Sequence, residues 1–341
     1  MATDAEVLAM RHAFALACTP GVPLGPNPRV GAVVIGVDGH VLGSGFHRGS
    51  GTAHAEIDAL SMVGPEAKGS TVVVSLEPCN HAGRTPPCAR ALIDAGVRRV
   101  VYAQTDPNPV ASGGATTLRA AGVDIEGGVL AAEAALVNEA WSFSMQAQRP
   151  FVTWKLATTL DGRAAAADGT SRWITGPAAR ADVHRLRARC DALLVGAGTV
   201  EIDDPRLTVR GDDDEPLPRE LQPLRVVMGT RRLDPAAAVF DGTADTRVLK
   251  TRDPANALSV LFADDRQHVW LEGGPTLAAS FARAGLVDEL IAYVAPALLG
   301  AGRSTVGDLG VATIDDTHRF DLLEAVRVGD DVRMTMRRKE S

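Results

Sequence analysis

Short apolar runs and amphipathic segments alternate along the chain, and this alternation constrains the fold more than any other feature. Strand–helix alternation of this kind predicts an α/β domain of about 145 residues in the first half. From the hydrophobic periodicity we expect helices over 4–18, 54–63 and 88–95, and strands over 30–36, 40–46, 70–79 and 98–106. The first two strands flank Asp38-Gly39, which predicts a hairpin turn.

A second alternation starts near Phe151 and has a different order of elements. Pro177 suits the first turn of a helix over 177–190, and Pro275 stands near the start of another helix. We expect buried strands over 191–199, 224–230, 268–274 and 289–299, and a solvated loop over 210–220. Because 341 residues exceed the usual size of one core, we predict two domains, 1–146 and 147–341, that meet within 145–150.

Charge and cysteine content exclude several classes of protein. The net charge of −7 argues against a large nucleic-acid surface. No apolar run approaches the roughly 20 residues that span a membrane, and acids precede the first apolar stretch, opposite to a signal peptide. Four scattered cysteines without an export signal predict a cytoplasmic protein whose thiols are ligands or core residues.

The stretch EPCNHAGRTPPC holds Cys79 and Cys88, and His54-Ala55-Glu56 opens a helix upstream. One imidazole and two thiolates give zinc three protein ligands and leave a fourth position for water, whose pKa the metal lowers. Glu56 stands two residues after His54, where it can shuttle protons. His-x-Glu followed by Pro-Cys and a second Cys is the general signature of zinc-dependent base deaminases. We therefore predict one catalytic Zn²⁺ per chain, with His54, Cys79 and Cys88 as ligands and Glu56 as the catalytic residue.

Other interpretations of these residues remain. His81 could be a fourth ligand, which would make the site structural. Two thiolates and an imidazole favour zinc, with iron as the alternative metal. Cys18 and Cys190 have no partner motif, so we expect them in the core.

The second half has one candidate phosphate-binding turn. No G-x-G-x-x-G opens a strand–helix unit, and Gly196-Ala197-Gly198 is only a fragment of one, so a Rossmann domain is not supported. In Glu272-Gly273-Gly274-Pro275-Thr276, the glycines let the backbone approach a phosphate, and the following helix presents free N–H groups.

These motifs together resemble the bacterial bifunctional riboflavin biosynthesis family, a deaminase joined to a reductase. The resemblance rests on HAE, LEPCNHAGRTPPC, PNPRVGAVV and DPNP in the first half, and on KLATTLDGR, SRWITG, DDPRLTVR, LEGGPTLA and AGLVDEL in the second. The eight residues between Cys79 and Cys88 are that family's spacing, and they separate the chain from tRNA adenosine deaminases and cytidine deaminases.

The resemblance implies both a fold and a pair of reactions. The fold is a cytidine-deaminase-like α/β/α domain followed by a dihydrofolate-reductase-like α/β domain. The deaminase removes the C2 amino group of 2,5-diamino-6-(5-phosphoribosylamino)pyrimidin-4(3H)-one as ammonia. The reductase then uses NADPH to convert the ribosyl chain, which gives 5-amino-6-(5-phosphoribitylamino)uracil. Family members commonly form homo-oligomers.

Binding residues follow from the matched positions. In the deaminase half the substrate contacts implied are Asn27, His47, Arg84 and Asn108. The NADPH contacts implied are Ala157, Trp173, Thr199, Asp203, Thr230, Gly274, Pro275, Thr276, Leu277, Ala278, Ala279 and Ser280. The reductase substrate contacts implied are Lys155, Ser171, Arg187, Leu207, Arg210 and Glu272. Beyond the resemblance, Arg231 and Arg232 follow a strand end, where a guanidinium could meet the 2′-phosphate of NADPH.

Three other functions stay open at this point. The first is a nucleic-acid or nucleoside deaminase with an appended domain, which the acidic charge and the cysteine spacing oppose. The second is a zinc- and NADP-binding sensor without activity, against which Glu56 argues. The third is a chain that keeps only one of the two activities.

Overall fold

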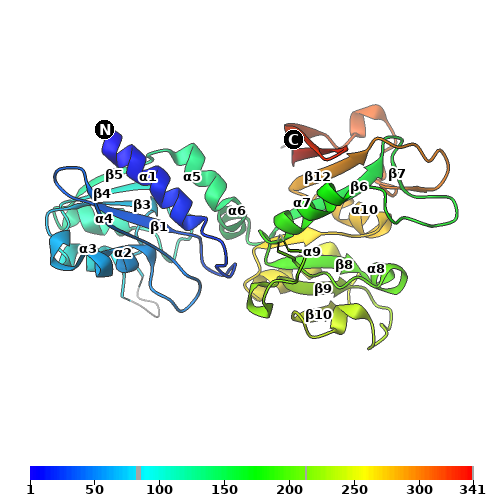
Figure 1. Cartoon of the computed structure of the whole chain (residues 1–341), viewed down its shortest axis with the longest axis horizontal. Helices are drawn as coiled ribbons and strands as arrows, with labels where there is room; N and C mark the ends of the chain where they lie inside the picture. The colour runs from blue at the N-terminus through cyan, green and yellow to red at the C-terminus, as the bar shows by residue number, and fades with distance from the viewer. Residues whose placement is uncertain (82–85, 212, 340–341) are drawn as a thin grey trace. The chain divides into compact units, whose positions relative to one another are not determined.

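The chain divides into two compact units, Met1–Gln148 and Arg149–Ser341, in a computed structural model. The division lies two residues beyond the boundary expected from the sequence. The structure describes residues 1–81, 86–211 and 213–339. Each unit is built around one mixed β-sheet with helices on both faces (Figure 1).

The first unit contains a five-stranded sheet in the order β2-β1-β3-β4-β5. The strands are β1 (Gly31–Ile35), β2 (Val41–Phe46), β3 (Thr71–Leu76), β4 (Arg99–Gln104) and β5 (Asp124–Gly127). β1 pairs antiparallel with β2 and β3, whereas β3, β4 and β5 are parallel. The hairpin turn lies at Asp38-Gly39, as predicted, with Gly39 at a φ of 84°.

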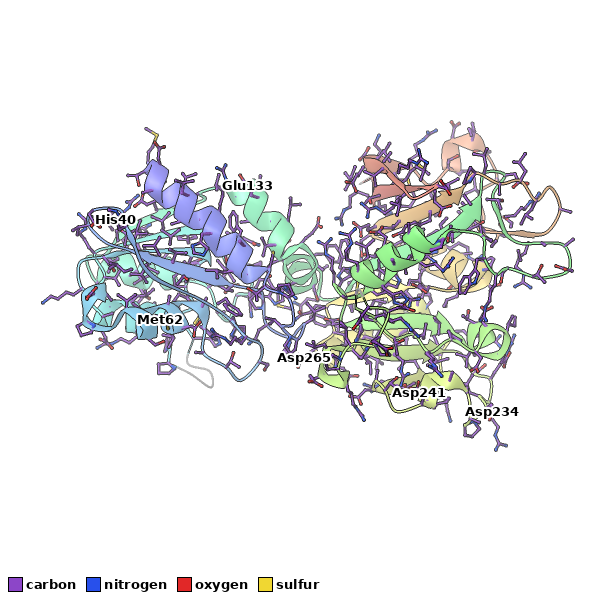
Figure 2. The ribbon with its side chains drawn as sticks, in the orientation of Figure 1. His40, Met62, Glu133, Asp234, Asp241 and Asp265 are labelled. Carbon is purple, nitrogen blue, oxygen red and sulfur yellow. The ribbon has the colours of Figure 1, made fainter. Side chains whose placement is uncertain are left out.

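Two helical layers cover this sheet because its strands bury side chains on both faces. The helices are α1 (Asp4–Ala17), α2 (Ala55–Val63), α3 (Cys88–Asp94), α4 (Gly114–Ala120), α5 (Ala131–Val137) and α6 (Glu139–Ala147). On one face α1 and α5 pack against Val33 and Val73, and on the other α2, α3 and α4 pack against Val34 and Val72. Figure 2 shows His40, Met62 and Glu133, which project outward from the hairpin, α2 and α5.

The second unit contains an eight-stranded sheet in the order β10-β9-β8-β11-β6-β12-β15-β14. The strands from β10 to β12 in this order are parallel, and β15 and β14 complete the sheet antiparallel. The strands are β6 (Phe151–Thr159), β8 (Ala192–Gly196), β9 (Leu224–Met228), β10 (Thr246–Leu249), β11 (His268–Leu271), β12 (Glu289–Ala295), β14 (Phe320–Val328) and β15 (Asp331–Arg338). A separate two-stranded sheet joins β7 (Arg163–Ala165) to β13 (Arg303–Ser304).

Helices cover both faces of this sheet as well. They are α7 (Pro177–Arg187), α8 (Ala197–Asp203), α9 (Pro254–Ala263) and α10 (Pro275–Arg283). α7 and α8 share a core with Trp270, while α9 and α10 share a core with Leu271 on the opposite face. Neighbouring residues of one strand thus point to opposite layers, as the two-residue period of a strand requires.

Several predicted strands are shorter than the apolar runs that indicated them. The strand expected over 191–199 ends at Gly196, because Ala197 begins α8. The one expected over 289–299 ends at Ala295, and the one over 70–79 ends at Leu76, before the Glu77-Pro78-Cys79 loop. Sequence periodicity did not predict α4, α5, α6, α9, β10 or the β14–β15 hairpin. In the described part of the chain no helix has the length and apolar character that crossing a membrane requires.

Candidate active sites

The predicted zinc ligands converge at the carboxyl end of β3. His54 precedes the first residue of α2, Cys79 lies in the loop after β3, and Cys88 is the first residue of α3. One donor atom from each lies within 4.8 Å of the others. His54 Nδ1 is 3.2 Å from Cys88 Sγ and 3.5 Å from Cys79 Sγ. Segments far apart in the sequence therefore present one imidazole nitrogen and two sulfurs to one point.

The electrostatics of this cluster suit a cationic metal. The hydrogen bond from the Cys88 thiol lowers the pKa of Cys79 to about 4, and it raises the pKa of Cys88. One thiolate therefore forms readily, and thiolate is the form that binds zinc. Among the described residues the donor set consists of His54, Cys79 and Cys88 and does not include His81. The three donors fit a zinc ion that keeps one position open.

Glu56 lies within this site and is almost fully buried. It is the second residue of α2, and its carboxyl group shares a hydrogen bond with the Cys88 thiol at the start of α3. Burial raises the pKa of Glu56 to about 7, and the negative charge of Cys79 adds to this effect. A carboxyl group with a pKa near neutrality can both accept and release a proton.

Asn27 and His47 form a hydrogen-bonded pair beside the metal cluster. His47 Nδ1 donates to the carbonyl oxygen of Ala53 at 3.0 Å, so Nε2 accepts from Asn27 Nδ2 at 2.9 Å. The His47 ring meets the His54 ring edge to face, with centroids 5.5 Å apart. Burial lowers the pKa of His47, which keeps it neutral in this role. Among the described residues no group donates to the Asn27 amide oxygen, which can therefore accept from a ligand.

The other two predicted substrate contacts of the deaminase half are Asn108 and Arg84. Asn108 Oδ1 accepts from the Val110 backbone N–H at 3.1 Å, so this oxygen stabilises its own turn. Arg84 lies outside the described residues.

Glu77 is a buried residue of this site that the sequence motifs did not single out. Its carboxylate accepts from the backbone N–H groups of Asp106 at 3.3 Å and Ala115 at 3.1 Å. It thereby ties the loop after β4 and the start of α4 to the cysteine loop. A Cβ on Gly114 would lie 1.7 Å from the Pro78 carbonyl oxygen, so only glycine permits this close approach. Its position directly before Pro78-Cys79 is the one feature of the sequence that could have marked Glu77 as part of the site.

The second unit holds a cavity of about 2180 Å³ along the carboxyl ends of its parallel strands. Ligands bind at this edge in open α/β sheets. The volume exceeds that of typical small-molecule pockets, so a dinucleotide and a second ligand can both fit. The predicted residues that line it are Lys155, Ala157, Ser171, Trp173, Arg187, Thr199, Asp203, Leu207, Arg210, Thr230, Glu272, Gly274, Pro275, Thr276, Leu277 and Ser280.

Three of the predicted residues do not line this cavity. Ala278 and Ala279 are buried on the inner face of α10, where they pack into the domain interior. Arg231 lines the cavity but Arg232 does not. The glycine turn exposes the first turn of α10 to a ligand. Beyond that turn, one face of the helix lines the cavity and the other packs into the core.

Lys155, Arg187 and Glu272 form a charged cluster in the cavity wall. Arg187 donates to both Glu272 oxygens, with Nε to Oε1 at 2.7 Å. Burial by itself raises the pKa of Glu272, but Arg187 and Lys155 outweigh burial and bring it to about 2. Burial lowers the pKa of Lys155, and Glu272 opposes that shift. The buried Trp270 indole also donates to Glu272 Oε1, a contact not evident in the sequence.

Trp173 lies on the rim of the same cavity and is 70% exposed. The Arg180 guanidinium stacks on its ring at 4.4 Å from the centroid. An aromatic face this accessible offers a flat apolar surface to a cofactor ring.

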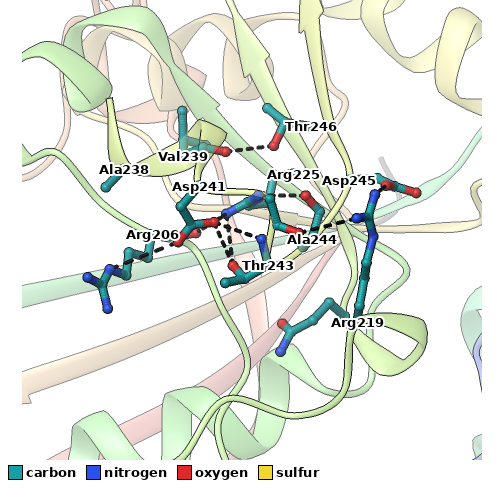
Figure 3. A network of polar contacts seen from close by, with 12 residues as sticks. Arg206, Arg219, Arg225, Ala238, Val239, Asp241, Thr243, Ala244, Asp245 and Thr246 are labelled. Carbon is teal, nitrogen blue, oxygen red and sulfur yellow. Dashed lines mark hydrogen bonds and ion pairs between the residues drawn. The ribbon is translucent and has the colours of Figure 1, made fainter. Parts of the chain in front are cut away.

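A fully buried arginine lies at the centre of a polar network that includes the cavity-lining residue Arg206 (Figure 3). Arg225 on β9 donates to Asp241 Oδ1 at 2.9 Å, to the Arg206 carbonyl at 3.0 Å and to the Ala244 carbonyl. Arg206 and its neighbour Leu207 line the cavity, and Leu207 has a φ of 52°, unusual for a bulky side chain. The network therefore holds this segment in place.

The two sites define a class of protein: a zinc-dependent deaminase joined to an α/β reductase. Comparison with known proteins agrees in both halves. Residues 4–104 match the model of the cytidine and deoxycytidylate deaminase zinc-binding region, and residues 150–334 match that of the RibD C-terminal domain.

Whole-chain relatives identify the family. The chain is 46% identical to the riboflavin biosynthesis protein RibD of Mycobacterium tuberculosis over 98% of this chain and 96% of the relative. It is 40% identical to that of Escherichia coli over 90% and 92%. The solved structure of Acinetobacter baumannii RibD superposes with a TM-score of 0.91 at 37% identity, covering 98% of this chain and 99% of that one. A Thermotoga maritima deaminase/reductase superposes with a TM-score of 0.86 at 30% identity over the same shares.

The chain therefore belongs to the RibD family of bifunctional deaminase/reductase enzymes of riboflavin biosynthesis. This confirms the predicted fold class, with a cytidine-deaminase-like domain followed by a RibD-type reductase domain. It also confirms the predicted enzyme class and the zinc and NADPH requirements. The match of residues 150–334 to the RibD C-terminal domain argues against the alternative of a nucleic-acid or nucleoside deaminase with an appended domain.

Proposed function

We propose that residues 1–146 deaminate 2,5-diamino-6-(5-phosphoribosylamino)pyrimidin-4(3H)-one at C2, and that residues 147–341 reduce the ribosyl chain of the product. The observation that carries the first step is the convergence of His54, Cys79 and Cys88 beside the buried Glu56. The Thermotoga maritima relative is described as a diaminohydroxyphosphoribosylaminopyrimidine deaminase/5-amino-6-(5-phosphoribosylamino)uracil reductase, and the whole-chain likeness supports the same substrates here.

In the deaminase site, His54, Cys79 and Cys88 would hold the zinc ion, which supplies a Lewis acid that lowers the pKa of water. Glu56 takes a proton from the attacking water as its oxygen bonds to C2, and it delivers this proton to the amino group, so that the C2–N bond breaks and ammonia departs. Its raised pKa, about 7, suits both transfers. The Asn27 amide, oriented by its hydrogen bond to His47, accepts from the pyrimidine edge.

Arg84 and Asn108 complete the substrate site in this proposal. Arg84 contributes a guanidinium fork for the phosphate. Asn108 contributes its amide N–H₂ group, since its oxygen is engaged by the Val110 backbone.

In the reductase site, NADPH supplies the hydride, and the cavity residues hold it against the ribosyl chain. We propose that Ala157, Trp173, Thr199, Asp203 and Thr230 bind the cofactor, together with Gly274 and the cavity-facing residues of α10, Pro275, Thr276, Leu277 and Ser280, while Ala278 and Ala279 only pack behind them. Ser171, Leu207 and Arg210 would contact the substrate, and Arg210 and Arg187 suit its phosphate. Lys155 and Glu272 place a cation and an anion beside the ribosyl chain of the substrate.

A single assay tests both steps. Ammonia release and NADPH oxidation are followed on the diaminopyrimidine substrate for the wild type and Glu56→Gln. We expect the variant to lose both signals and to recover NADPH oxidation when the deaminated pyrimidine is supplied. Ammonia without NADPH oxidation in the wild type would restrict the activity to the first half.

We also propose that the chain is a cytoplasmic homo-oligomer. All four cysteines are free, which suits a reducing compartment. β14 forms an edge of the large sheet and exposes Leu322 and Leu323, as a strand covered by a second copy would. Sedimentation equilibrium measures the mass, and a monomer at micromolar concentration would contradict this proposal.

A further inference from the structure

Two arginines stand at equivalent places on neighbouring strands of the reductase sheet. β9 and β10 are parallel, and their last residues, Met228 and Leu249, lie opposite each other. Arg231 follows Met228 by three residues, and Arg252 follows Leu249 by three residues. Both line the large cavity, at the outer edge of the sheet.

The guanidinium of Arg231 is accessible and lies close to the predicted cofactor residues. It is 60% exposed and pairs with Glu201, which is 38% exposed. Its Nη1 lies 3.7 Å from the position that a Gly198 Cβ would take, next to Thr199. Exposed ion pairs stabilise a protein little, so an incoming dianion can replace Glu201 as the partner.

Arg252 lacks even such a partner. It is exposed, and among the described residues its guanidinium has no ion pair or hydrogen bond. Two arginines at a cavity rim, one unpaired and one weakly paired, present up to ten N–H donors in two planar forks. This geometry matches a phosphate group better than a neutral ligand.

The order of the strands indicates which phosphate group of the dinucleotide would lie near these two arginines. From β6, with Lys155 and Ala157, the carboxyl edge passes β11, with the glycine turn, and β8, before it reaches β9 and β10. Four inter-strand steps of about 4.8 Å separate β6 from β10, roughly 19 Å in all. A dinucleotide with its nicotinamide beside Lys155 and its pyrophosphate on the glycine turn has its adenosine at β9 and β10.

We propose that Arg231 and Arg252 bind the 2′-phosphate of the NADPH adenosine ribose and so select NADPH over NADH. This inference rests on the proposed reductase function for the orientation of the cofactor. It revises the sequence-based expectation, which paired Arg231 with Arg232, because Arg232 does not line the cavity and Arg252 does. The two residues stand at equivalent places only through the pairing of β9 with β10, which the sequence does not reveal.

Binding measurements on the full-length, zinc-loaded protein test the proposal without catalysis. Isothermal titration calorimetry compares adenosine 2′,5′-bisphosphate with 5′-AMP, and NADPH with NADH. The variants are Arg231→Gln, Arg252→Gln, the double variant, and Arg232→Gln as the matched control from the same turn. Circular dichroism and thermal melting confirm that each variant is folded.

We expect each single variant to weaken adenosine 2′,5′-bisphosphate and NADPH roughly 10-fold, and the double variant about 100-fold or more, since hydrogen bonds to charged groups contribute on this scale. Affinity for 5′-AMP and NADH should not change in any variant, and Arg232→Gln should resemble the wild type. Glu201→Gln should tighten NADPH, because it removes the competing carboxylate.

Other outcomes overturn the proposal in distinguishable ways. Equal loss of NADPH and NADH in the double variant would mean that the arginines only support the cavity. Unchanged NADPH affinity with a raised KM for the pyrimidine would place the substrate phosphate there instead. A wild type that binds neither dinucleotide would contradict the reductase function itself, and not this assignment alone.

Discussion

Arg187 and Glu272 form a two-pronged ion pair in the wall of the reductase cavity, with Arg187 Nε 2.7 Å from Glu272 Oε1. The family resemblance implied both residues as substrate contacts, but each also binds the other. Glu272 fixes the plane of the Arg187 guanidinium, and Trp270 fixes Glu272. Arg187 is therefore oriented before the substrate arrives, which reduces the entropy lost on binding.

Replacing Glu272 with Gln should destabilise the reductase half, because it leaves Arg187 and Lys155 without their counter-charge. We expect a loss of about 3 kcal/mol at pH 7, the lower end for breaking a buried pair. Urea titration followed by tryptophan fluorescence measures it, since Trp154, Trp173 and Trp270 all lie in this unit. The exposed Glu201→Gln should change stability by less than about 1 kcal/mol.

The same carboxylate predicts how stability depends on pH. The folded-state pKa of Glu272, about 2, lies below its ordinary value of 4.5. Its contribution is therefore complete above about pH 5 and is lost as the pH falls toward 2. The stability difference between the wild type and Glu272→Gln should shrink over this range. A difference that stays constant down to pH 3 would show that the pair does not depend on the Glu272 charge.

Glu56→Gln keeps the shape of the side chain but cannot carry a proton. We expect deamination to fall by roughly 10²- to 10⁴-fold, the usual contribution of general acid–base catalysis. Zinc content, measured by atomic emission, should stay at the wild-type level because Glu56 is not in the donor set. A variant that loses zinc together with activity would instead make Glu56 a residue that supports the metal.

Zinc removal should separate the two activities. Chelation, or Cys88→Ser, should abolish deamination while reduction of the deaminated pyrimidine continues, since the donor set lies wholly in the first unit. The control is Cys18→Ser, because Cys18 is an exposed thiol outside the site, whereas the sequence predicts a core position for it. Loss of reduction on chelation would show that the second site also needs the metal.

Arg225 and Arg219 offer a matched pair of substitutions within one network (Figure 3). Arg225 is fully buried and binds Asp241, so Arg225→Met should destabilise by about 3–5 kcal/mol, because Asp241 loses its buried partner and keeps only Thr243 and the more distant Arg206. Arg219 pairs with Asp245 on the surface, so Arg219→Met should cost at most about 1 kcal/mol. Because Arg225 holds the Arg206 carbonyl, its replacement should also raise the KM of the reductase for its pyrimidine substrate.

Denaturant unfolding gives the two stability changes, and steady-state kinetics at low temperature gives the KM. Equal destabilisation by both substitutions would contradict the dependence on burial. An unchanged KM in a folded Arg225→Met would show that the Arg206–Leu207 segment does not need this support.

The linear sequence was sufficient wherever neighbouring residues form the element or motif. α1, the β1–β2 hairpin and α7 follow from periodicity, glycine and proline, which act within a few residues. The zinc ligands were recognisable because His-x-Glu and Pro-Cys carry their own spacing. The short helices α4 to α6 were not predicted, since their packing against the sheet, and not their own periodicity, stabilises them.

Tertiary structure decided the relationships between residues that are distant in the chain. Glu77 reaches Ala115 only because β3 and β4 are parallel neighbours. Arg231 and Arg252 line the same part of the cavity edge because β9 pairs with β10. Glu272 binds Arg187, 85 positions away, across the end of a strand. The sequence thus determined the local elements and the functional groups that the chain carries. Strand order determined their partners, because contacts over long sequence separations depend on how the whole sheet assembles.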